Sequence, residues 1–143
     1  MKFTTLFCSF ALTLLSVHGL TTSYDTAYDN AGQSLDTVAC SNGPNGLESL
    51  GFTTFGSLPS FPNIGGAPAV TGWNSPNCGT CWNLTYVNPR GISKSINILA
   101  IDVATPNFNI AEEAMNTLTG GQAVQLGRVT ITAHQVVQSL CGL

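Results

Sequence analysis

The sequence Cys-Gly-Thr-Cys at residues 78–81 constrains the fold of this chain more than any other feature. Two cysteines at this spacing can form a redox pair, half of a zinc site, or the meeting point of two disulfides. Redox activation needs the first cysteine at a helix N-terminus, but the residues after Cys81 alternate as in a strand. A zinc site needs a second close-spaced pair of ligands, whereas Cys40, His134 and Cys141 do not provide one. We therefore expect structural disulfides and no metal site.

The N-terminal segment indicates the compartment in which these cysteines are oxidised. A short positive start precedes an apolar run over residues 3–17, and Gly19 supplies a small residue at a cleavage position. The run is shorter than the ~20 apolar residues that span a bilayer. We predict a signal peptide over residues 1–19, which removes Cys8 and leaves a secreted domain over residues 20–143. An even cysteine count in a small exported protein indicates disulfides.

The four remaining cysteines allow three pairings. A bridge between Cys78 and Cys81 would close a tiny, strained loop and constrain little else. Of the other two pairings we choose Cys40–Cys78 with Cys81–Cys141. Each bridge would then close a long loop, which stabilises the fold by roughly 4 kcal/mol in the chain-entropy model.

The secreted domain carries very little charge. Its cationic residues are Arg90, Lys94 and Arg128, against seven Asp and Glu residues. Nucleic acid and anionic membranes are bound by clustered Lys and Arg, so we exclude both as partners, and no later stretch is apolar enough for a membrane span. Neutral amides and hydroxyls match the hydrogen-bonding groups of uncharged sugars, although many secreted β-rich proteins share this composition.

Residue alternation predicts a mostly β fold with short helices. Residues 81–86 alternate as a strand with Trp82 on its core face, and the turn residues at 88–91 would fold the chain back as a hairpin. Residues 96–101 are apolar at nearly every position, as in a strand that is covered on both faces. A further strand is expected over residues 129–137, which are rich in β-branched side chains.

The sequence also predicts two helices and one irregular segment. Asn109 and Glu112 fit a capping box for a helix over residues 110–118, which the following glycines would end. A second, short helix is expected over residues 46–50. Residues 52–77 are rich in proline and glycine and show no period, so we expect a long and functional loop there.

These motifs resemble, in order over the secreted domain, those of the cerato-platanins, small secreted proteins of filamentous fungi. The shared segments are SYDTAYDN, VACSNG, FPNIGG, GWNSPNCGTCW, LAIDVA, FNIAEEAM and the final cysteine. The resemblance implies a single-domain double-psi β-barrel similar to the first domain of expansins. It also implies bridges from the first cysteine to the second and from the third to the fourth, in agreement with the pairing chosen above.

The resemblance further implies a function. Its members bind chitin or N-acetylglucosamine oligomers, have expansin-like effects on cellulosic material, and elicit plant defence, for which plant receptors would be partners. They also self-associate and collect at air–water interfaces. The resemblance implies no cofactor, and it places the protein outside the cell or in the fungal cell wall.

Carried over residue by residue, the resemblance assigns a carbohydrate-binding groove to Asp102 and to Asn109, which follows the aromatic Phe108. A further position, acidic in some members, is Asn74 in this chain. Aromatic faces suit the apolar face of a sugar ring. The aromatic candidates are Tyr28, Phe108 and Trp73.

Catalysis by these residues is not expected. Glycoside hydrolysis generally needs two carboxyl groups about 5–5.5 Å apart for retention or about 6.5–9.5 Å apart for inversion. Asp102, which ends a buried apolar strand, is the best candidate, but it lacks an assured partner and could instead cap the turn that follows. Two alternatives to a non-hydrolytic binder stay open: a weak polysaccharide-cleaving enzyme on the same barrel, and a self-assembling, surface-active coat protein.

Overall fold

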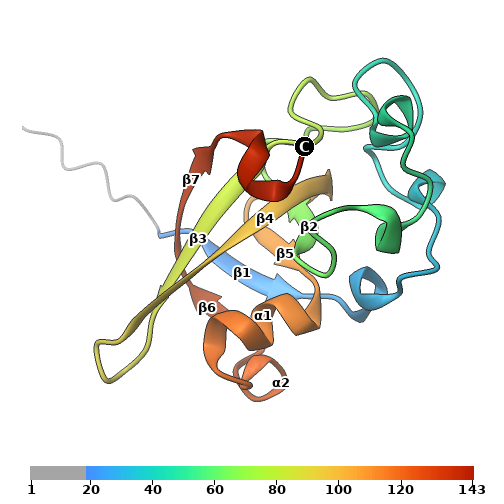
Figure 1. Cartoon of the computed structure of the whole chain (residues 1–143). Helices are drawn as coiled ribbons and strands as arrows, with labels where there is room; N and C mark the ends of the chain where they lie inside the picture. Colours follow the sequence, from blue (N-terminus) through green and yellow to red (C-terminus); the bar gives the residue numbers. More distant parts are fainter. Residues whose placement is uncertain (1–18) are drawn as a thin grey trace, which may run out of the picture.

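The computed structural model describes residues 19–143, so the predicted signal peptide falls, apart from Gly19, outside the described residues. The fold is mostly β with short helices, as predicted (Figure 1). The strands are β1 (Thr21–Tyr24), β2 (Ile64–Ala67), β3 (Cys81–Val87), β4 (Ser93–Val103), β5 (Phe108–Ile110), β6 (Arg128–Thr130) and β7 (Thr132–Val136). The α-helices are α1 (Glu112–Thr119) and α2 (Ala123–Leu126). The 3-10 helices are η1 (Thr26–Asp29), η2 (Leu35–Thr37), η3 (Leu47–Leu50), η4 (Phe55–Ser57) and η5 (Gln138–Cys141).

The strands form one sheet in the order β6-β1-β5-β2-β4-β3-β7. Its two end strands follow each other in the chain, with only Ile131 between them. No ladder joins β6 to β7 within residues 19–143, so the sheet is open and a closed double-psi barrel is not confirmed. The single strand predicted over residues 129–137 is wrong at Ile131, because β6 pairs with β1 whereas β7 pairs with β3.

The predicted hairpin is confirmed. Strands β3 and β4 pair antiparallel from Cys81 opposite Leu99 to Val87 opposite Ser93, and the hairpin projects from the rest of the domain (Figure 1). The turn closes where the N–H of Gly91 donates to the carbonyl of Asn88 at 2.8 Å. The run of apolar residues in β4 is buried on both faces of the sheet, as its composition predicted. Its fully buried members are Ile98, Leu99, Ala100 and Ile101.

The segment 52–77 is more regular than predicted, since it contains η4 and β2. Strand β2 lies inside the sheet between β5 and β4, and all its residues are buried. A Cβ on Gly65 would lie 2.4 Å from the carbonyl oxygen of Asn109. Glycine is therefore required for the strands to approach so closely, and its lack of a side chain removes the alternation by which a strand is normally recognised.

Helix α1 begins later than predicted and has a different cap. Asn109 lies in β5, and the cap position is Ala111, which has no side-chain acceptor. The acceptor is instead Asp29, whose carboxylate receives hydrogen bonds from the N–H groups of Glu112 (2.8 Å) and Glu113 (2.9 Å). The end of the helix is as predicted, at Gly120 in the left-handed conformation. The short helix predicted over residues 46–50 is η3.

Both predicted disulfides are confirmed, Cys40–Cys78 and Cys81–Cys141. They anchor two distant parts of the chain to neighbouring positions beside the start of β3. Trp82 is partly buried, packs against the core, and has its ring edge against Phe108 at a centroid distance of 5.8 Å. Within residues 19–143, none of the helices combines the length and apolar character needed to cross a bilayer.

Candidate functional site

Five residues form a row across five strands of the sheet. Asp102 in β4 pairs with Gly66 in β2, which pairs with Asn109 in β5. Asn109 is also paired with Ser23 in β1, and Ser23 with Arg128 in β6. Residues paired across neighbouring strands direct their side chains to the same face. The row therefore brings a carboxylate, an amide, a hydroxyl and a guanidinium to one face of the sheet.

Asp102 is held at its end of the row by three donors. The hydroxyl of Tyr28 donates to Oδ2 at 3.0 Å, and the N–H of Ala39 donates to Oδ1 at 3.1 Å. The N–H of Val103 donates to Oδ1 at 2.8 Å, which fits the turn-capping role considered for Asp102. Burial raises the pKa of Tyr28, and the carboxylate of Asp102 raises it further. The hydroxyl therefore stays protonated at neutral pH and remains a donor.

Gly66 separates Asp102 from Asn109. A Cβ on this glycine would lie 2.8 Å from the Cβ of Ala104 and 2.9 Å from the carbonyl oxygen of Val103. The connection from β4 to β5 therefore passes over Gly66 and occupies the space between the two polar side chains. As a result, Asn109 faces the cleft on one side of this connection, whereas Asp102 is not among the residues that line it.

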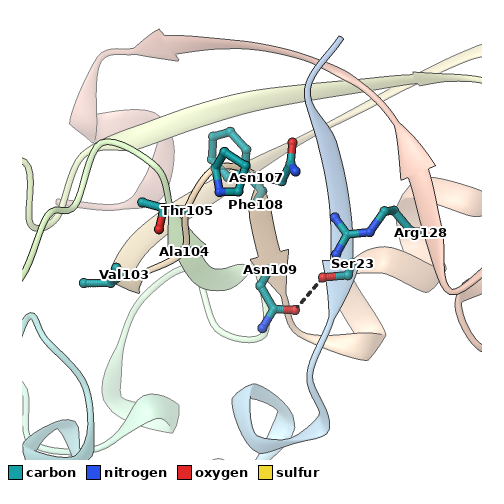
Figure 2. Close-up of a pocket in the computed structure, with 9 residues that line it drawn as sticks. Ser23, Val103, Ala104, Thr105, Asn107, Phe108, Asn109 and Arg128 are labelled. Carbon is teal, nitrogen blue, oxygen red and sulfur yellow. Dashed lines mark hydrogen bonds between the residues drawn. The ribbon is translucent and has the colours of Figure 1, made fainter. Parts of the chain in front are cut away.

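The cleft on the Asn109 side has a volume of about 430 Å³. Figure 2 shows the side chain of Asn109 pointing toward Ser23, with Arg128 beside Ser23. The walls come from β1, β5, β6 and the β4–β5 connection. The lining residues are Ser23, Val103, Ala104, Thr105, Pro106, Asn107, Phe108, Asn109 and Arg128.

Hydrogen bonds fix the polar side chains of the cleft. Ser23 Oγ donates to Asn109 Oδ1 at 3.0 Å, and the N–H of Thr21 donates to Asn107 Oδ1 at 3.0 Å. One nitrogen of the Arg128 guanidinium donates to Thr21 Oγ1 at 2.7 Å. Sequence reasoning missed Asn107, which lies two residues before Asn109, and it missed Ser23 and Arg128 because only the strand register places them beside Asn109.

Two of the predicted aromatic contacts present little surface. The side chain of Phe108 is 2% exposed and packs against Trp82, and Tyr28 is 6% exposed. A sugar ring could therefore reach only a small part of either ring. The structure brings Phe108 and Asn109 together at the cleft, and it places Tyr28 beside Asp102.

Asn74 belongs to a different part of the surface. Its Oδ1 accepts from the N–H of Asn45 at 2.9 Å, and its backbone is left-handed, with a φ of 57°. The neighbouring Trp73 is 63% exposed, and its indole N–H donates to Asn42 Oδ1 at 2.7 Å. None of these residues lines the cleft. Trp73 is thus an exposed aromatic side chain of fixed orientation at a second location.

The acidic residues do not assemble beside Asp102. Asp29 caps α1, and Asp25 accepts from the N–H of Ala27 at 2.8 Å as the cap of η1. The neighbouring carboxylate of Asp36, which can accept a hydrogen bond from protonated Glu48, raises the pKa of Glu48, but these two residues lie in η2 and η3 outside the row. Among the described residues, no group of three or more His, Cys, Asp or Glu could hold a metal ion.

Comparison with known proteins shows which family of proteins this chain resembles in sequence. The family model described as Cerato-platanin matches residues 20–143. The "Allergen Asp f 15 homolog" of Arthroderma benhamiae is 53% identical over 84% of this chain, and the chain spans 57% of that relative's length.

Solved structures agree with this result. The crystal structure of cerato-platanin 1 from M. perniciosa is 45% identical, with a TM-score of 0.82 over 85% of this chain and 98% of that chain. The solution structure of the fungal elicitor Cerato-Platanin is 41% identical, with a TM-score of 0.74 over 85% of this chain and 96% of that chain.

Proposed function

Because this chain belongs to the cerato-platanin family, we propose that it is a secreted protein that binds cell-wall polysaccharide without hydrolysing it and elicits plant defence. Chitin oligomers are the proposed ligand, and an expansin-like effect on cellulosic material is part of the same proposal. The proposal also includes the double-psi crossing of the strands. This crossing stays a prediction, because the strands form an open sheet and not a closed barrel.

The observation that carries this proposal is the polar cleft at Asn109. Its neutral hydroxyl and amide groups can exchange hydrogen bonds with sugar hydroxyls and N-acetyl groups, and their positions are fixed by Ser23 and Thr21 before a ligand arrives. Preorganised side chains lower the entropy cost of binding. The cleft volume of about 430 Å³ also lies within the roughly 300–1,000 Å³ typical of small-ligand sites.

Binding without hydrolysis is supported by the surroundings of Asp102. Hydrolysis generally requires two carboxyl groups that flank the scissile bond. The row contributes one carboxylate, and that carboxylate already accepts three hydrogen bonds. Asp25 and Asp29, the acids nearest in sequence to Tyr28, are used as helix caps.

The elicitor part of the proposal is supported by a relative. A structure that is 41% identical to this chain is described as that of a fungal elicitor. Infiltration of the purified protein into leaves should produce a defence response, and a boiled, reduced sample should not.

Isothermal titration with a chitin oligomer tests binding, and a reducing-sugar assay on the same sample tests hydrolysis. Asn109→Ala should weaken binding, because it removes an amide from the cleft wall, and Asn45→Ala should not, because Asn45 bonds to Asn74 and does not line the cleft. No heat at millimolar ligand would refute the binding proposal. Sustained release of reducing ends that is lost in Asp102→Asn would instead establish the enzyme.

A surface-active coat protein is the second candidate, and exposed apolar side chains favour it. Several large apolar residues are more than half exposed, and exposed apolar surface promotes association. They are Leu50, Trp73, Val87, Ile92, Val124, Val137 and Leu140. Film formation at an air–water interface that chitin oligomers fail to disperse would favour this function over sugar binding.

A further inference from the structure

The polar groups that remain free in the cleft are mainly donors. The amide oxygen of Asn109 already accepts from Ser23, and the amide oxygen of Asn107 already accepts from Thr21. Each of these two amides therefore has its NH₂ group left for a ligand. Each amide thus keeps two N–H donors and one lone pair of its oxygen, so its unused donors outnumber its unused acceptors.

Arg128 adds a charged donor to the same wall. Its guanidinium has five N–H donors, and one nitrogen is held by the 2.7 Å hydrogen bond to Thr21 Oγ1. The remaining N–H groups are available, and the bond to Thr21 fixes where they lie. Among the residues that the structure describes, none that lines the cleft is an Asp or Glu. The charge of Arg128 is thus not balanced by the cleft itself.

A cleft of this kind requires a ligand that brings acceptors, and a negatively charged acceptor matches it best. A carboxylate can receive two parallel hydrogen bonds from a guanidinium, and such charge-assisted bonds are roughly twice as strong as neutral ones. The N-acetyl carbonyl of a neutral sugar can accept from Asn107 and Asn109, but it leaves the charge of Arg128 unpaired.

We propose that the cleft binds an acidic saccharide, in which the carboxylate of a uronic acid residue pairs with Arg128 while its hydroxyls meet Asn107 and Asn109. This inference rests on the proposed saccharide binding of the same cleft and names its preferred substrate class. The size of the cleft favours a sugar over a simple anion, because a phosphate ion would leave most of the 430 Å³ empty.

Isothermal titration with a short oligogalacturonate and with its methyl ester provides the test. The two ligands have the same rings and hydroxyls, but only the first is charged, so the wild-type protein should bind the acid more tightly. Raising the salt concentration should weaken binding of the acid and leave binding of the ester nearly unchanged. Equal affinity for acid and ester would overturn the proposal.

Substitutions locate the binding site. Arg128→Gln should weaken binding of the acid by about ten-fold, and Arg128→Lys, which keeps the charge but loses the planar fork, by an intermediate factor. Arg90→Gln is the matched control, since it removes the same charge from the turn between β3 and β4. Loss of binding in Arg90→Gln but not in Arg128→Gln would place the ligand elsewhere and refute the assignment.

Two further titrations distinguish this proposal from a general anion site and from the proposed binding of chitin. Inorganic phosphate should compete with the oligogalacturonate only weakly, and strong competition would show a general anion site in place of a saccharide site. A chitin oligomer reports on the proposed function by itself. If chitin binds and the acid does not bind more tightly, the acidic-substrate inference fails while the proposed function stands; if neither binds, both fail.

Discussion

The hydroxyl of Tyr28 donates a 3.0 Å hydrogen bond to the carboxylate of Asp102. This contact joins η1, near the start of the domain, to the end of β4. Tyr28 is 6% exposed, whereas its acceptor Asp102 is only partly buried. The hydrogen bond therefore ties the end of β4 to a segment that lies far from it in the sequence.

Replacing Tyr28 with phenylalanine should destabilise the protein. The change leaves the aromatic packing against Phe55 and removes a single donor, whose loss leaves a carboxylate oxygen without its partner. Hydrogen bonds to charged groups contribute about 1.5–3 kcal/mol, and a decrease of that order is expected in the free energy of unfolding. Guanidinium denaturation measures it; an unchanged midpoint would show that water replaces the hydroxyl at no cost.

The same tyrosine should make stability depend on alkaline pH. Burial and the nearby Asp102 carboxylate raise the pKa of Tyr28 in the folded state, whereas in the unfolded state it is about 10. The unfolded chain therefore loses this proton first, and stability is lost as the pH rises above about 10. Denaturation of the wild type and of Tyr28→Phe between neutral and alkaline pH should show a steeper decline in the wild type. Parallel curves would contradict the prediction.

Removing the carboxylate of Asp29 should destabilise helix α1. This side chain accepts from the first two N–H groups of the helix, and loss of an N-terminal cap typically costs about 0.5–2 kcal/mol. Asp29→Ala should lower the midpoint of thermal unfolding, whereas Glu113→Gln, a neighbouring loss of one negative charge, should have a smaller effect. Similar losses in both variants would indicate an effect of charge and not of the cap.

A side chain at Gly66 should damage both stability and binding. The added methyl of Gly66→Ala would lie 2.8 Å from the Cβ of Ala104, so the β4–β5 connection would have to move. Overpacking of this kind typically costs about 1–3 kcal/mol. Gly72→Ala is the matched control, because a Cβ there has no atom within 4 Å. Titration with a saccharide and thermal unfolding of both variants test the prediction, which fails if the two behave alike.

The two disulfides should contribute comparably to stability. The bridges Cys40–Cys78 and Cys81–Cys141 span 38 and 60 residues. In the chain-entropy model each bridge stabilises the fold by about 4 kcal/mol, and the bridge that closes the longer loop contributes slightly more. Double Cys→Ala variants that remove one bridge each should show large, similar decreases in the denaturation midpoint. A large loss for one bridge alone would point to native-state packing as the main source of stabilisation.

Sequence reasoning was reliable where the signal is local. The hairpin follows from alternation and from a turn within a few residues, and the end of α1 follows from Gly120. The disulfide pairing was also predicted: strain argued against a bridge between Cys78 and Cys81, and the pairing chosen from the remaining two agreed with the family resemblance. For the hairpin and the helix end, the residues that determine the structure are few and are identifiable without knowledge of their spatial neighbours.

The predictions fail where residues distant in the sequence determine the local structure. The cap of α1 comes from Asp29, which is far from the helix in sequence, so the nearer Asn109 was chosen instead. Strand β2 was missed because its glycines fit against neighbouring backbone, which no pattern along the chain reveals. Of the candidate site, Asn109 was predicted by resemblance, whereas Arg128 becomes visible only once β6 is paired with β1.

The single residue between β6 and β7 has a consequence for self-association. A sheet with two free margins can grow by taking up strands from other molecules. Here Ile131 tethers one margin to the other, and its N–H is already bonded to the carbonyl of Leu20 at 2.9 Å. The N–H of Ile131 is therefore not available to pair with a strand of another molecule. Copies of this protein that gather at an air–water interface have exposed apolar side chains with which to do so, and they need no strand pairing at this residue.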